Sequence, residues 1–336
     1  MKKDRIKYLD IAKFIGIFCI YLGHFGNFAG KAYNFVFSFH VALFFFLPGC
    51  TETLTSDIPW YKYIKKNIKN LLIPCYFFAF VSLLLDCILT DTHTEIIPNL
   101  INILKGCIRN QYFAFSLWFL TCLFVIRIAF YFIRKLLKYN LLCIIVCLCL
   151  FIIAEKVINP RPIVNPSMVY NIDSACYYII FYALGYCCFD KIRCLLALDC
   201  SYKKIICAGL GFVCLIYSAL LFFGKNLLNY ISTNAFMGLI CNLLCPIITI
   251  CLVLIISKLL ENVRLFNELG NNTLFLCGSE YIIKLLIPSC FQIVGLGISL
   301  SNPVVTYLYT FALLIVCNKT LVPLEKAIFR KFHLLK

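Results

Sequence analysis

The chain has 336 residues, of which 62% are hydrophobic and only 14% are charged, and its mean hydropathy is +0.93. Soluble domains carry about a quarter charged residues, so this composition excludes an ordinary soluble fold and indicates an integral membrane protein. The net charge of +16 comes from small basic groups at the ends of apolar stretches, which is not the pattern of a nucleic-acid-binding face.

Apolar stretches predict about ten transmembrane helices in one all-α, polytopic membrane domain that covers residues 1–336. The predicted helices cover 11–28, 35–54, 71–89, 116–133, 140–157, 174–189, 205–223, 235–257, 273–291 and 304–321. The basic N-terminal segment resembles a secretory signal, but Lys13 interrupts its apolar run and no cleavage site of small residues follows. We therefore expect the first helix to be a permanent span.

The basic residues predict how the helices are oriented. Of the 31 Lys and Arg residues, 22 fall on the side that holds both termini, 6 on the opposite side and 3 inside the predicted spans. Because positive charge accumulates on the cytoplasmic side, both termini are expected to be cytoplasmic. Arg127 is expected to reach the cytoplasmic end of its helix and Asp86 to be solvated at the outer side. The outer connectors 90–115 and 159–167 could cover an outward-facing site.

The 22 cysteines do not predict a disulfide framework or a metal site. Many lie inside apolar stretches, including Cys143, Cys147 and Cys149, where cysteine behaves as a small hydrophobic residue. The sequence has no matched CxxC pair and no histidine cluster with zinc-binding spacing, so no metal is expected.

The first helix carries three ionisable residues on one stripe. Asp10 and Lys13 are three residues apart and can pair, while Lys13 and His24 are separated by roughly 20° after three full turns. The helical rise places His24 about 16 Å further along the helix than Lys13. This arrangement puts a fixed positive charge where a cytosolic phosphate could bind, and a titratable imidazole deeper in the membrane.

The second helix adds another histidine. A turn centred near residue 32 would bring His40 to the depth of His24, with Ser38 one turn or less away. Two imidazoles in a low-dielectric site could keep one of them neutral, the form that a general base requires. The alternative is a structural pair, bonded to the backbone or to each other. The aligned Lys13 favours the functional interpretation.

A family resemblance rests on the first two helices. The residues that carry it are Tyr8 to Lys13, Gly23-His24, Phe37 to His40, Leu43 to Phe46, and Gly49. This pattern resembles the acyltransferase 3 family, ten-helix bacterial membrane enzymes that O-acylate surface polysaccharides and related glycans. Less specific similarities follow at 117–120, 181–185 and 269–274, so the resemblance extends along the whole chain.

The resemblance implies an acyl-CoA co-substrate, most often acetyl-CoA, that enters from the cytoplasm, and no permanently bound cofactor. It implies a glycan or lipid-linked sugar acceptor and a location in the bacterial cytoplasmic membrane. The family's basic residue and essential histidine correspond to Lys13 and His24, and its second-helix histidine to His40. We expect His24, His40 and Asp10 to be catalytic, and Lys13, Ser38 and Trp118 to bind the donor. The acyl group, acceptor sugar and oligomeric state stay open.

The sequence departs from the family pattern at three positions. Lys13 replaces a frequent arginine and offers a point charge in place of a bidentate fork. Pro48 stands where a serine usually precedes Gly49, and Glu280 stands where many members have a histidine. Glu280 has Lys284 four residues on, so an ion pair that steadies its helix is at least as well supported as a catalytic role.

The mechanism that these residues suggest is direct transfer. His24 would take the proton from a sugar hydroxyl as that oxygen attacks the thioester, and His40 or Asn272 could donate to the oxyanion. An acyl-histidine intermediate is the competing route. Two other functions stay open: an exporter of an acylated glycan or small acid with a histidine proton relay, and an inactive scaffold in polysaccharide assembly.

Overall fold

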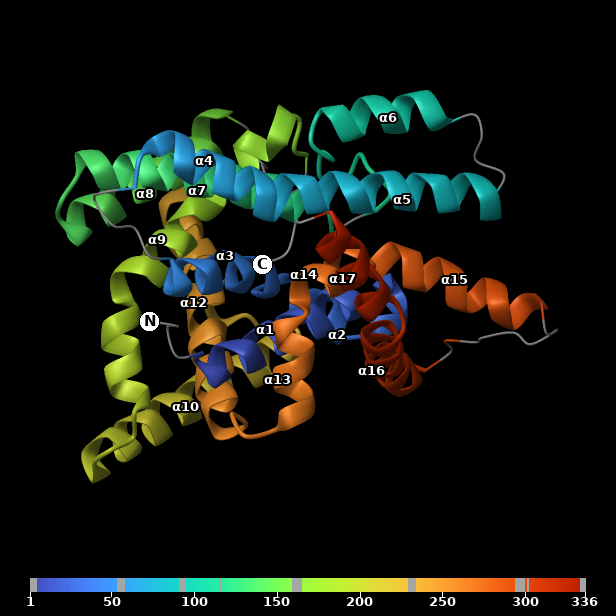
Figure 1. Cartoon of the computed structure of the whole chain (residues 1–336). Coiled ribbons are helices and arrows are strands. Elements are labelled where there is room, and N and C mark those ends of the chain that lie inside the picture. Colours follow the sequence, from blue (N-terminus) through green and yellow to red (C-terminus); the bar gives the residue numbers. More distant parts are fainter. Residues whose placement is uncertain are drawn as a thin grey trace. The chain divides into compact units, whose positions relative to one another are not determined.

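The computed structural model describes residues 5–52, 58–90, 95–114, 116–158, 165–228, 234–293, 300 and 302–332, and within these ranges it contains helices and no strand (Figure 1). Contacts divide the chain into two compact units. Unit 1 comprises 1–51, 184–273 and 300–314, and unit 2 comprises 52–183, 274–299 and 315–336. The helix α9 (Ile172–Leu196) contributes to both.

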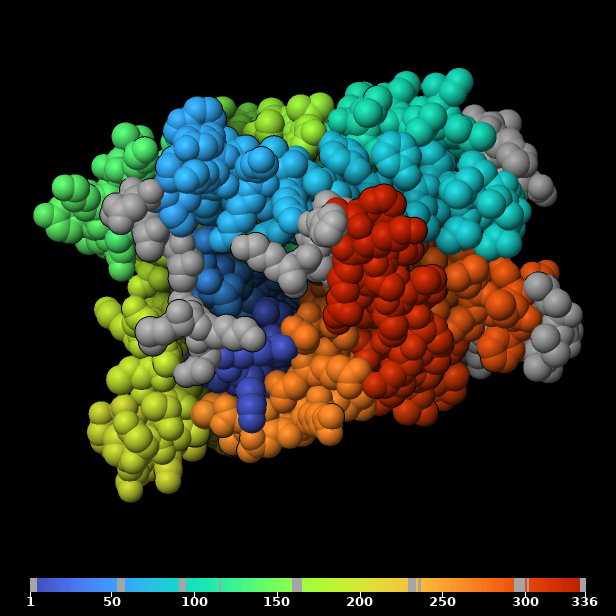
Figure 2. All heavy atoms as spheres, viewed as in Figure 1, coloured from blue at the N-terminus to red at the C-terminus, as the bar shows by residue number. Residues whose placement is uncertain are grey.

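Unit 1 is built around α1 (Lys7–Gly23), which packs against α13 (Arg264–Asn271) (Figure 1). The two backbones approach so closely that a Cβ atom on Gly270 would lie 1.7 Å from the carbonyl oxygen of Asp10. Phe14 stacks on Phe266 at a ring-centroid distance of 4.4 Å. These contacts make α13 antiparallel to α1. In Figure 2 the start of α1 reaches the surface beside α13.

The hairpin after α1 differs from the predicted helices 11–28 and 35–54. α1 ends at Gly23 and a 3₁₀ turn, η1 (Gly26–Ala29), follows. The next span is divided into α2 (Ala32–Phe37) and α3 (His40–Thr51). At the division, the Ser38 hydroxyl donates to the Phe35 carbonyl and the His40 ring bonds the Val36 carbonyl. Side chains that occupy these carbonyls compete with the regular helical hydrogen bonds.

The other long helices described in unit 1 are the second part of α9, α10 (Ser201–Phe222), α12 (Ala235–Leu259) and the first part of α16 (Pro303–Lys319). α9 meets α3 at Gly185, where an added Cβ would lie 2.1 Å from the Phe46 carbonyl oxygen. The glycine in the segment 181–185 therefore permits a close helix contact.

In unit 2, α4 (Trp60–Asn67), the π-helix η2 (Ile68–Leu72) and α5 (Ile73–Leu89) form one continuous rod. Pro74 lacks the N–H that would bond to the carbonyl of Asn70, which accounts for the wide turn just before it. α6 (Ile96–Leu104) lies along α5 (Figures 1 and 2). Its Ile97 and Leu104 are exposed, as apolar side chains are on a helix that lies along a membrane interface.

The remaining helices of unit 2 are α7 (Trp118–Leu136), α8 (Asn140–Ile153), η4 (Ala154–Ile158), η5 (Val169–Asn171), the first part of α9, α14 (Thr273–Gly278), α15 (Glu280–Ile293) and α17 (Leu321–Lys331). The predicted helix 273–291 is interrupted at Ser279, whose hydroxyl donates to the Phe275 carbonyl. Of the two outer connectors, 91–94, 115 and 159–164 lie outside the described residues.

Six helices in the described part of the chain are long and apolar enough to cross a membrane. They cover Ala32–Thr51, Trp60–Leu89, Asn140–Ile158, Ser201–Phe222, Met237–Leu259 and Pro303–Lys331. The all-helical class is thus confirmed. The number of about ten spans and the cytoplasmic position of both termini stay predictions.

Candidate active site

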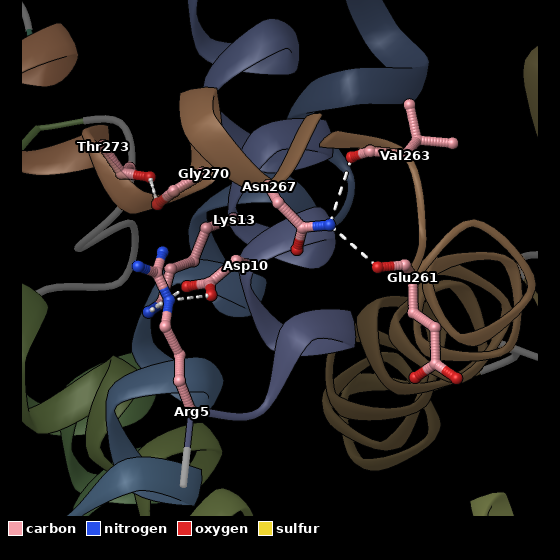
Figure 3. Close-up of polar contacts among 8 residues, drawn as sticks. All are labelled: Arg5, Asp10, Lys13, Glu261, Val263, Asn267, Gly270 and Thr273. Atoms are coloured by element: carbon pink, nitrogen blue, oxygen red, sulfur yellow. Dashed lines mark hydrogen bonds and ion pairs between the residues drawn. The ribbon is translucent and has the colours of Figure 1, made fainter. Parts of the chain in front are cut away.

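A cluster of charged side chains surrounds the start of α1. Arg5 Nε donates to Asp10 Oδ2 at 2.5 Å, and Lys13 Nζ donates to Asp10 Oδ1 at 3.3 Å (Figure 3). Asp10 is only 4% exposed, whereas the side chains of Arg5 and Lys13 are 52% and 30% exposed. The predicted pairing of Asp10 with Lys13 is confirmed, and the carboxylate orients two cations toward one region.

These cations line a cavity of about 300 Å³ that extends to α3 and α9. Its charged lining residues are Arg5, Lys13 and Arg193 on one hand, and Asp10 and Asp190 on the other, which leaves one net positive charge. Within the described residues, no hydrogen bond or ion pair engages Arg193, which is exposed. The cavity can therefore present a guanidinium to an anion.

The local fold holds this cluster in place through α13. The side-chain amide of Asn267 donates to the Glu261 and Val263 carbonyls at 2.8 and 3.1 Å, which fixes the turn into α13 (Figure 3). At the other end of α13, the Thr273 hydroxyl donates to the Gly270 carbonyl (Figure 3). Because both of its ends are fixed, α13 can pack closely against α1 at Asp10.

Tyr8 lies next to this cluster on α1. Burial raises the pKa of Tyr8 to about 12, with a smaller contribution from Cys50, so the phenol stays protonated at neutral pH. The ammonium group of Lys258 lies 5.9 Å from the centre of its ring. Tyr8 therefore adds no negative charge near the cavity.

The two histidines lie at the other end of α1. His24 is the residue that follows the last turn of α1, and its backbone N–H donates to the Ile20 carbonyl at 3.1 Å. Its ring centroid is 6.4 Å from that of Phe37, and the Phe37 centroid is 5.0 Å from that of His40. Both imidazoles thus contact the same phenyl ring. Their predicted catalytic roles stay predictions.

His40 is held in one tautomer. Its Nδ1 lies 2.5 Å from the Val36 carbonyl oxygen, and because a carbonyl can only accept, Nδ1 carries the hydrogen. A neutral ring then has its lone pair on Nε2, which suits a base or an acceptor better than an oxyanion donor. Ser38, predicted to bind the donor, uses its hydroxyl hydrogen for the Phe35 carbonyl at 2.6 Å.

Asn272 lies at the opposite end of α1 from His24. It follows α13, two residues after the contact between Gly270 and Asp10. Asp10 and His24 are separated by 14 residues, or roughly 21 Å of helix. This position favours a structural role near the cation cluster over the predicted oxyanion contact at His24.

Trp118 belongs to unit 2 and starts α7. The guanidinium of Arg109 lies 4.6 Å from the centre of its ring, and Arg109 donates to the Tyr178 hydroxyl at 3.4 Å. Trp118 is only 7% exposed. Its aromatic face is thus in contact with the guanidinium of Arg109. Its predicted role in donor binding stays a prediction.

Glu280 and Lys284 also belong to unit 2. Lys284 Nζ donates to Glu280 Oε1 at 2.8 Å, and the two side chains are 17% and 4% exposed, respectively. The predicted ion pair along the helix is therefore confirmed. Since each group neutralises the other, the geometry supports the structural interpretation of this pair.

A buried polar network in unit 2 was not anticipated. Glu52 Oε2 accepts hydrogen bonds from Tyr63 at 2.9 Å and Tyr182 at 2.8 Å, and it lies 3.6 Å from Arg127 Nε. Arg127 also donates to Asn67 Oδ1 at 3.1 Å. The expectation that Arg127 extends to the helix end is wrong, because its side chain is 19% exposed and paired with a carboxylate.

Asp86 gives a similar correction. It is 5% exposed and accepts a hydrogen bond from the Tyr281 hydroxyl, so it is not solvated as expected. No local sequence pattern pairs Asp86 with a tyrosine 195 residues away. For Arg193 the sequence does contain a signal, because it lies three residues after Asp190, which places both residues on one face of α9.

Comparison with known proteins supports the pattern of the first two helices. A family profile described as an acyltransferase domain, Acyl_transf_3, matches residues 6–318 and so includes helices of both units. No curated protein and no solved structure matches the chain.

Proposed function

Since the chain belongs to the acyltransferase 3 family, whose profile covers nearly all of it, we propose that it is a membrane O-acyltransferase that moves an acyl group, most simply acetyl, from acyl-CoA to a glycan hydroxyl. The acceptor would be a cell-surface glycan or its lipid-linked precursor, and the enzyme would act in the bacterial cytoplasmic membrane. The observation that carries the proposal is the cation-lined cavity at one end of α1, with His24 at the other end.

The cavity supports a phosphate-bearing donor. Lys13 supplies an ammonium group, while Arg5 and Arg193 supply the planar guanidinium groups that bind phosphate through paired hydrogen bonds. The arginines can thus provide the directional contact that Lys13 alone lacks. The separation of about 16 Å between Lys13 and His24 leaves the length of α1 for an extended pantetheine arm.

The reaction would proceed at the His24 end. The imidazole of His24 accepts the proton of the acceptor hydroxyl as its oxygen attacks the thioester carbonyl. The C–S bond then breaks, the acyl group stays on the sugar oxygen, and the imidazolium returns its proton to the departing thiolate of coenzyme A. His40, whose Nδ1 is bonded to the Val36 carbonyl, would hold the orientation of Phe37, the ring that both imidazoles contact.

The transfer is tested in cells. Deletion strains complemented with the wild-type chain or with His24→Ala are compared by mass spectrometry of their surface glycans. We expect acyl groups to be lost with His24→Ala, a general base being worth about 10²- to 10⁴-fold in rate. Asn27→Ala, an exposed position in η1, is the matched control and should restore them. Normal acylation in the His24→Ala strain would refute the mechanism.

Donor binding is tested on purified protein. Adenosine 3′,5′-bisphosphate, which carries the phosphates of coenzyme A without the thioester, should protect the protein against thermal unfolding. Arg193→Ala should weaken the probe about tenfold, the effect of losing one hydrogen bond to a charged group. Lys7→Ala removes an exposed cation of α1 that does not line the cavity and should bind normally. Equal binding by all three proteins would contradict the assignment of the cavity.

A further inference from the structure

A second cavity lies in unit 1 and has a different chemistry. It has a volume of about 220 Å³ and is lined only by Phe, Leu, Ile and Cys side chains from α3, α9, α10 and α12. Examples from the last three helices are Ile192, Leu210 and Leu254. It exceeds the engineered apolar cavity of about 150 Å³ that binds benzene, so it has room for a hydrocarbon ligand. We refer to it as the apolar groove.

The helices around the apolar groove identify the surroundings from which a ligand would come. α10 and α12 are two of the helices that are long and apolar enough to span a membrane, and only 22% and 44% of their apolar windows are buried in the protein. Leu210, which lines the groove on α10, is 40% exposed. In a bilayer, the apolar surfaces of α10 and α12 that the protein leaves uncovered would contact lipid chains.

Charged residues flank the apolar groove on α9. Leu184, Cys188 and Ile192 follow one another at intervals of four residues and form a stripe along the groove. Successive helical residues are about 100° apart, so Lys191 and Arg193 lie on either side of Ile192. Both are exposed. Arg193 lines the cation-lined cavity, whereas Lys191 does not, so a hydrocarbon chain in the groove would end near one available cation, Lys191.

We infer that the apolar groove binds one chain of an anionic phospholipid of the surrounding bilayer, with the lipid phosphate near Lys191, since Arg193 lines the cation-lined cavity. The chain packs against the Leu and Ile side chains of α9, α10 and α12. The phosphate pairs with the exposed ammonium group of Lys191. Because the groove and the cation-lined cavity adjoin different faces of the same part of α9, the lipid supports the helix that also carries Arg193.

The inference is tested by native mass spectrometry of the purified chain after exchange from nanodiscs of phosphatidylglycerol and phosphatidylcholine in equal amounts. We expect one retained phosphatidylglycerol per chain. Leu210→Trp fills the groove and should remove it, whereas Val213→Trp, 62% exposed on the same helix and not part of the lining, should keep it. Lys191→Ala should lower the preference for phosphatidylglycerol about fivefold, the contribution of one basic residue near a membrane surface.

Several results would overturn the inference: no retained lipid, retention of phosphatidylcholine alone, equal retention by Leu210→Trp, or a second protein chain in its place. Thermal unfolding of each variant in lipid-free detergent shows whether the tryptophan has merely disrupted the fold. If Leu210→Trp is unfolded, Ile192→Trp provides the same test from α9. Lipid retention needs neither acyl-CoA nor an acceptor, so its failure leaves the proposed acyl transfer standing.

Discussion

Charged groups of this chain occupy two contrasting environments. At the start of α1, the carboxylate of Asp10 forms ion pairs with Arg5 and Lys13, which are both partly exposed. Arg193 lines the same cavity. In unit 2, Glu52 is almost fully buried and accepts hydrogen bonds from two tyrosines beside Arg127. The first cluster has positive charge left for a ligand, whereas the protein itself satisfies the second. The proposed donor binding therefore concerns the first environment, whereas the second supports the structure.

The largest effect is expected from Arg127→Ala, which tests the structural side of this contrast. The substitution leaves the Glu52 carboxylate buried without its cation. Breaking a buried ion pair from one side costs about 3–5 kcal/mol in the free energy of unfolding. We expect a correspondingly lower midpoint of thermal unfolding in detergent.

Lys135→Ala, an exposed position on the same helix, is the control for Arg127→Ala and should unfold like the wild-type chain. If Arg127→Ala were as stable as this control and yet bound adenosine 3′,5′-bisphosphate less tightly, the contrast between the two environments would be reversed.

An intermediate effect is expected from Gly270→Ala. The new Cβ would lie 1.7 Å from the Asp10 carbonyl oxygen, so α13 must move away from α1. Such overpacking costs about 1–3 kcal/mol and would also loosen the cation cluster. Calorimetry should show a loss of stability, and probe binding should weaken. Gly209→Ala in α10, where an added Cβ meets nothing within 4 Å, should change neither property. Wild-type stability of Gly270→Ala would show that the helix contact is not close.

Much of the fold could be predicted from local pattern. Apolar stretches located the helices, and the spacing of Asp10 with Lys13 and of Glu280 with Lys284 predicted two ion pairs that the structure contains. Both depend only on helical periodicity. The breaks at Ser38 and Ser279 were missed because side-chain hydrogen bonds to the backbone, and not apolar periodicity, decide them.

Contacts between distant segments set the limit of sequence reasoning. The partners of Glu52 lie 11 to 130 residues away, and nothing in their local sequence indicates that they meet. Likewise, the contribution of Arg193 to the cavity depends on how α9 packs against α1 and α3. The motif at 269–274 could be recognised, but its physical reason, the close contact of Gly270 with Asp10, required the structure.

The smallest effect is expected from Asp10→Asn, which separates positioning from catalysis. The amide has nearly the same shape but no charge, so the cavity gains one net positive charge. Two unit charges about 4 Å apart in water interact by about 1 kcal/mol, so adenosine 3′,5′-bisphosphate should bind about fivefold more tightly at low salt. The gain should vanish near 1 M salt, where the Debye length is only about 3 Å.

The control is Asp199→Asn, which changes an exposed carboxylate that does not line the cavity and should leave the affinity for the probe unchanged. A kcat reduced about 100-fold or more in Asp10→Asn would instead restore the catalytic role predicted from the sequence.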